Sequence, residues 1–175
     1  MLTPRALLVW LAFAAAGCGG SSAPSPAAAH PGFVGAKACE ECHAEETAKW
    51  RQSDHHRAMA PADAANVVGD FGGASFEYHG VTSKFSRADG KYRVTTDGAD
   101  GALHDFDIAY TFGFRPLQQY LIDVGGGRLQ ALNVCWDSRP KEAGGQRWFH
   151  LYPDEKVDHS HPFHWTGAFQ NWNYM

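Results

Sequence analysis

The sequence predicts an α+β fold, in which a short helical segment packs on an antiparallel β-domain after an export signal and a flexible linker. Two observations support this prediction. Residues 44–59 contain good helix formers without Gly or Pro, whereas residues 75–152 alternate apolar and polar side chains between Gly-containing turns. The chain has 175 residues, 44% of them hydrophobic, which is enough for one domain with its own core.

Residues 1–17 predict an export signal, because Arg5 precedes an apolar run that is too short to span a bilayer comfortably. The run ends in Ala-Ala-Gly-Cys, which resembles the lipobox of bacterial lipoproteins, where the signal is cut before a cysteine that becomes diacylated. Ala15 stands where a lipobox usually has leucine, so ordinary cleavage is an alternative to lipidation of Cys18. Either route places the protein in the bacterial periplasm, with a lipid anchor as its expected contact with the membrane.

Residues 18–32 predict a flexible linker, since they are rich in Gly, Ser, Pro and Ala and poor in large apolar groups. The folded part is expected to comprise a helical segment over residues 33–64 and a β-rich domain over residues 65–175. The net charge of −4 provides no basic field for a polyanion, so nucleic acid is not an expected partner.

A Cys-x-x-Cys-His motif opens the helical segment, with Cys39, Cys42 and His43. Residues three and four apart share one face of a helical turn, so two thiols and an imidazole can address the same flat group. Covalent haem attachment needs this set, two thiols for the porphyrin vinyl groups and an imidazole for the iron, and the spacing is its signature. We therefore expect haem c on Cys39 and Cys42, with His43 as an axial ligand.

Two alternatives use the same cysteines. A disulfide between Cys39 and Cys42 would suit an oxidising compartment, but it gives His43 no role. A zinc site could add His55, which twelve residues separate from Cys42, yet no second histidine follows at the spacing typical of zinc fingers. Haem attachment accounts for all three residues of the motif.

A second axial ligand is expected from the residues that follow the motif. A helix through residue 59 would place His55 and Met59 on one face and direct His56 elsewhere. Another cluster, Asp-His-Ser-His-Pro-Phe-His-Trp, could hold a metal ion, line a haem pocket or form a Pro-broken loop. Its three histidines are His159, His161 and His164.

The middle of the chain predicts antiparallel strands. An Asp89-Gly90 pair between apolar alternations is a strong hairpin signal, and residues 120–136 offer two apolar strands across a run of three glycines. Cys135 lies in the second of these strands, and both faces there are apolar, so we expect a buried thiol without chemistry. The dense aromatic residues after residue 147 are expected to form core or an interface.

The stretch from Phe33 to Met59 resembles the opening of multihaem cytochromes c related to the tetrahaem cytochrome of nitrifying bacteria. In these proteins the motif is followed by Trp-x-x-Ser-x-His-x-x-Ala-Met, which here runs from Trp50 through Ser53, His55 and Ala58 to Met59. The resemblance implies that His55, rather than His56, is an axial ligand, either of this haem or of another.

Later stretches, including Trp-Asn-Tyr-Met at residues 172–175, are similar to a branch of that family whose members often carry tetratricopeptide repeats. This similarity implies an N-terminal fragment of a larger multihaem protein, with the remaining part of the chain as a partner. The expected function is electron transfer with redox partner proteins. The alternative is a haem enzyme with an open distal site that acts on a small nitrogen or oxygen species.

Overall fold

The computed structural model describes residues 34–174. The predicted export signal, the lipidation site at Cys18 and the predicted linker lie outside the described residues. Among residues 34–174, no helix has both the length and the apolar character needed to cross a membrane.

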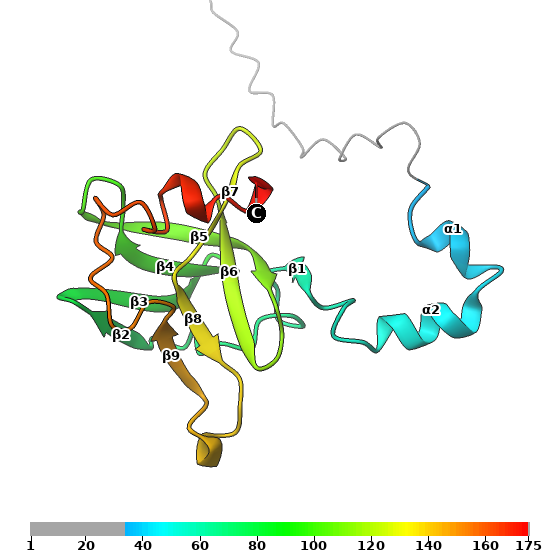
Figure 1. The fold of residues 1–175 in the computed structure, drawn as a ribbon. Helices are drawn as coiled ribbons and strands as arrows, with labels where there is room; N and C mark the ends of the chain where they lie inside the picture. Colours follow the sequence, from blue (N-terminus) through cyan, green and yellow to red (C-terminus); the bar gives the residue numbers. More distant parts are fainter. Residues whose placement is uncertain (1–33, 175) are drawn as a thin grey trace, which may run out of the picture.

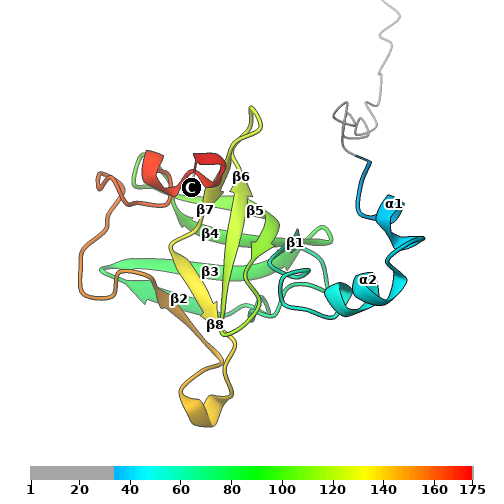
Figure 2. The ribbon, with the colours of Figure 1, turned by 45° about the vertical axis from the view of Figure 1, so that its right-hand side comes forward.

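Two short helices come first, α1 (Lys37–Glu40) and α2 (Ala44–Arg51). Figures 1 and 2 show both helices to one side of the sheet, and no residue of either is buried. The prediction that this segment packs on the β-domain is therefore wrong. The physical reason is the surface of the helices, which is polar on most sides and has no apolar stripe to bury. Arg51 instead joins the two helices through a bidentate ion pair with Glu40 at 2.7 and 2.9 Å.

The predicted helix through Met59 ends early, at Arg51. The Ser53 hydroxyl donates to the Trp50 carbonyl at 2.6 Å, and the Ser53 N–H donates to the same oxygen at 2.9 Å. A serine side chain that bonds the local backbone in this way competes with continuation of the helix. Turns then lead to β1 (Met59–Pro61), which pairs with a strand of the sheet, so Met59 is extended rather than helical.

The rest of the described chain is an antiparallel sheet of nine strands. Its main path runs in the order β2, β3, β4, β5, β6, β8 and β9, while β1 pairs with β5 and β7 pairs with β6. The bounds are β2 (Ser75–Tyr78), β3 (Val81–Ala88), β4 (Lys91–Asp97), β5 (Leu103–Phe112), β6 (Leu117–Asp123), β7 (Leu129–Ala131), β8 (Val134–Asp137) and β9 (Arg147–His150). Three 3₁₀ turns complete the fold, η1 (Lys141–Ala143), η2 (Ala168–Gln170) and η3 (Trp172–Tyr174).

The predicted hairpin is confirmed, since Asp89 and Gly90 join β3 to β4 with φ values of 52° and 75°. Positive φ at both central residues matches the right-handed twist of a two-residue hairpin. The strand expected after the three glycines is divided into β7 and β8, and the Leu132 N–H between them still donates to Tyr120 at 2.9 Å. The prediction of an α+β chain that is mainly antiparallel sheet is confirmed.

Aromatic rings dominate the core. Phe85 stacks on Trp148 with ring centroids 3.5 Å apart, and Phe71 meets both rings edge-on. Trp148 and Trp165 are buried, as the aromatic density at the end of the chain predicts, but Phe169 and Tyr174 remain exposed. Rings of this size contribute most of the apolar area that a small domain buries.

Cys135 is fully buried in β8, as predicted. Its thiol lies 3.6 Å from the Asn133 carbonyl, and burial raises the pKa of the thiol. The group therefore stays protonated at neutral pH and packs as a small apolar side chain.

Candidate functional site

The Cys-x-x-Cys-His motif forms the turn that joins the two helices. Cys39 lies in α1, Cys42 follows it, and His43 is the residue immediately before α2. The His43 N–H donates to the Cys39 carbonyl at 3.0 Å, and the His43 carbonyl accepts the Thr47 N–H at 2.9 Å. The backbone bonds therefore keep the two thiols and the imidazole on one local turn, as the sequence spacing predicts.

The three side chains of the motif are exposed, and both thiols are free. A shallow hollow at Cys39 is lined by Ala36, Glu46, Thr47 and the half-exposed ring of Trp50. A flat apolar group could cover this surface, while the thiols bond its edge and the imidazole reaches its metal. The donor set and the aromatic wall therefore fit a covalently held haem.

The candidates for a second axial ligand do not share a helix face. His55 lies in the turns after α2, where its carbonyl accepts the Ala58 N–H at 3.3 Å. Met59 lies in β1 opposite Phe112 of β5. His56 places its ring against Trp50, with centroids 4.4 Å apart, so it is the histidine that contacts the aromatic wall of the hollow. The helical argument for pairing His55 with Met59 is therefore wrong, and the choice of His55 depends on the family resemblance.

The second histidine cluster does not form a joint site. His159 is exposed, and the Nδ1 of His161 accepts the Phe163 N–H at 3.2 Å. His164 is buried, and both of its ring nitrogens have partners in the protein. Across residues 34–174, no three His, Cys, Asp or Glu side chains are grouped so that they could hold a metal ion.

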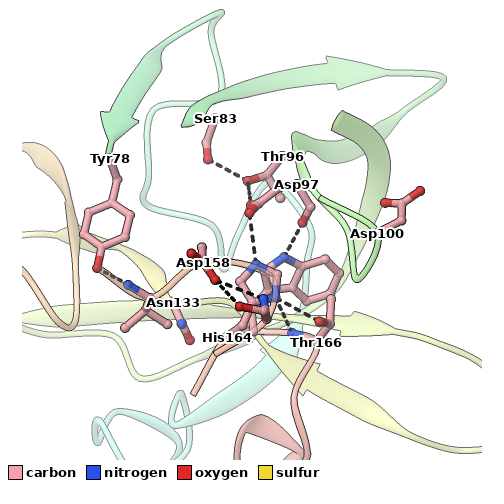
Figure 3. Close-up of polar contacts among 12 residues, drawn as sticks. Tyr78, Ser83, Thr96, Asp97, Asp100, Asn133, Asp158, His164 and Thr166 are labelled. Carbon is pink, nitrogen blue, oxygen red and sulfur yellow. Dashed lines mark hydrogen bonds and ion pairs between the residues drawn. The ribbon is translucent and has the colours of Figure 1, made fainter. Parts of the chain in front are cut away.

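Sequence reasoning missed the buried polar cluster that contains His164 (Figure 3). Its Nε2 lies 3.2 Å from the Asp97 carboxylate, and its Nδ1 lies 2.8 Å from the Thr166 hydroxyl. Burial by itself raises the pKa of Asp97, but hydrogen bonds from His164 and Thr96 outweigh it, so this pKa lies below its ordinary value. The apolar residues around His164 gave a signal for burial, whereas nothing in the pattern around Asp97, 67 residues away, indicated the partner.

In the comparison with known proteins, the match to a protein family lies on the two helices and the residues that follow them. Residues 38–70 match the family model described as cytochrome c554 and c-prime. The match includes the whole Cys-x-x-Cys-His motif, α2 and β1, and it supports a cytochrome c family, with covalently bound haem c, for this part of the chain. No curated protein and no solved structure matches the chain significantly.

Proposed function

We propose that the protein is a c-type cytochrome that carries single electrons, with haem held covalently by Cys39 and Cys42. The observation that carries this proposal is the motif turn, in which Cys39, Cys42 and His43 are all exposed, within the segment that matches cytochromes c. The haem would supply the one-electron chemistry. The protein would supply its attachment, one axial ligand at His43 and an aromatic wall at Trp50.

The finer parts of the proposal rest on the family resemblance and on the first residues of the sequence. They comprise His55 as second axial ligand, membership of the multihaem branch with tetratricopeptide repeats, and further protein sequence beyond this chain. They also include redox partner proteins and a periplasmic location with lipid at Cys18. The contact between Trp50 and His56 makes His56 the alternative axial ligand that the local geometry supports.

The test is expression in a host with haem-maturation machinery, followed by intact mass and a haem stain on a denaturing gel. Covalent haem should add its mass to the wild-type chain and give a stained band, and the Cys39→Ser/Cys42→Ser variant should lack both. Cys135→Ser is the matched control, because this buried thiol has no place in the motif and should leave the stain unchanged. A colourless wild-type protein with both motif thiols unmodified would overturn the proposal.

A second measurement separates the axial ligands. Spectra of the ferrous protein with and without carbon monoxide report whether a protein side chain occupies the sixth position. Carbon monoxide should bind readily to a His55→Ala variant if His55 is the ligand, and His56→Ala should then behave as wild type. The reverse result would assign His56 instead.

A further inference from the structure

A long segment near the end of the chain is held to the sheet mainly through side chains. Residues 151–167, here called the strap, follow β9 and contain no helix or strand. The Tyr78 hydroxyl of β2 donates to the Tyr152 carbonyl at 2.9 Å and accepts the Val157 N–H at 3.1 Å. Asp97, the last residue of β4, accepts the Trp165 indole N–H through its carbonyl at 2.7 Å. Residues 151–156 of the strap depend on such polar contacts rather than on a ladder of backbone bonds, whereas the later part also buries Val157, His164 and Trp165.

His150 stands at the point where β9 ends and the strap begins. Its Nδ1 accepts the Tyr152 N–H at 3.1 Å, and its ring stacks on Tyr78 with centroids 3.6 Å apart and planes 13° apart. A ring nitrogen that accepts a hydrogen bond cannot carry a proton, so this contact requires the neutral imidazole. Protonation would take place at Nδ1, the atom that holds the first turn of the strap.

The surroundings of His150 oppose its positive charge. The side chain is buried, and burial lowers its pKa to about 4 against an opposing effect from the Tyr152 backbone. Smaller lowering effects come from His164 and His79, and a small opposing effect comes from Asp97. These groups line one cavity of ≈ 40 Å³ between the sheet and the strap. Its charged and titratable lining groups are Tyr78, His79 and Asp97 from the sheet side, and Lys156, Asp158 and His164 from the strap.

We propose that the first part of the strap is an acid-released clasp, in which protonation of His150 at Nδ1 breaks its contact with Tyr152 and frees residues 151–156 from the sheet, while Trp165 stays in the core. Imidazolium at this position would also add positive charge to a cavity that already contains His79 and His164. The sheet does not need the strap for its strand pairing, because its ladders are formed among β1 to β9. Release would therefore open the cavity while the strands remain paired.

The sign of the pH dependence follows from the lowered pKa of His150. An unfolded histidine titrates near pH ~6.5, so the stabilising contribution of the neutral ring is complete above that value and is lost as the pH falls towards 4. Protonation of Asp97 affects stability only at a lower pH, because its own pKa is lowered. Its carboxylate stops accepting from His164 only when the pH falls through its own lowered pKa.

The test is hydrogen exchange of the full chain with its haem attached, followed by NMR or mass spectrometry between about pH 7 and pH 4. After correction for intrinsic exchange, protection of the amides of residues 151–157 should fall by up to about tenfold per pH unit inside this window, while the amides of β3, β4 and residues 163–167 stay protected. His150→Asn should remove the pH step, because its neutral amide oxygen takes the place of Nδ1 and can accept the Tyr152 N–H at any pH. His104→Gln is the control, since His104 is exposed and pairs with Asp100 outside the strap.

Two results would overturn the clasp. One is loss of protection in the strap and the sheet together, which would mean that acid unfolds the whole domain. The other is a strap that stays protected while the His150 ring titrates in the wild-type protein. NMR titration of the His150 ring in the wild-type chain distinguishes these outcomes even if His150→Asn does not fold.

Discussion

The helical segment and the β-domain differ in where their order comes from. Residues 34–58 contain α1, α2 and the turns after them, and none of these residues is buried. The sheet and the loops around it hold all the buried side chains of the described chain, among them the stacked pair Phe85 and Trp148. Short helices without a buried face gain little from packing and are marginal in water. The comparison teaches that the sheet stabilises itself, whereas the helical segment presents its chemistry on an exposed surface that a haem could cover.

The largest expected effect is the loss of unfolding free energy when an aromatic ring is removed from the β-domain, compared with removal of one from the helical segment. Phe85 is completely buried, so Phe85→Ala should lower the free energy of unfolding of the β-domain by about 3–5 kcal/mol. Trp50 is half-exposed, so Trp50→Ala should change the same quantity by less than about 0.5 kcal/mol. Urea unfolding followed by near-UV circular dichroism measures both. Equal losses in the two variants would contradict the division into two regions.

Breaking the buried Asp97 and His164 contact should have the next largest effect. Asp97→Asn keeps the size of the side chain but removes its charge, and it should cost about 1–3 kcal/mol at neutral pH. The wild-type contribution is present above the unfolded pKa of about 3.9 and is lost as the pH falls through the lower folded pKa, so the variant should show a flatter stability profile in acid. Unfolding curves at a series of pH values measure the difference. If the two proteins had parallel profiles of stability against pH, protonation of Asp97 would not be coupled to folding.

Loss of haem attachment should lower hydrogen-exchange protection in the helical segment and leave protection in the β-domain unchanged. In the Cys39→Ser/Cys42→Ser variant, amides of α1 and α2 should lose most of their hydrogen-exchange protection, because no buried face of their own replaces the haem contact. Amides of β3 to β6 should keep theirs. Exchange measured on the wild-type and variant proteins under the same conditions tests this, with Cys135→Ser as the control for loss of a thiol. Loss of protection in the sheet would show that haem also stabilises the β-domain.

The smallest effect should come from the surface of α2. Lys49 pairs with Glu45 at 2.7 Å, four residues earlier, and both side chains are exposed. Lys49→Ala should therefore weaken α2 by only about 0.3–0.5 kcal/mol, and less at high salt. Protection of α2 amides should fall slightly while the unfolding midpoint of the sheet stays the same. A shift of that midpoint would show that the two regions are coupled more strongly than their contacts indicate.

Local signals in the sequence predicted local structure well. Asp89 and Gly90 specify their hairpin, because a two-residue turn with positive φ favours these residues over almost all others. The apolar alternation on either side of this pair likewise predicted antiparallel strands, which the structure shows as β3 and β4. Prediction failed at the end of α2, where helix propensity favoured continuation but one hydroxyl of Ser53 bonded the Trp50 carbonyl instead.

By itself, the sequence determined the Cys39, Cys42 and His43 turn, because residues three and four apart meet within one turn of backbone whatever lies elsewhere in the chain. Only the tertiary structure decided which partners the histidines near the end of the chain contact. His164 found Asp97 across 67 residues of sequence, and the ring of His150 was fixed between Tyr78 and the strap. Such partners are chosen by the pairing of distant strands and by the cost of burying polar groups without hydrogen bonds, which spacing along the chain does not report.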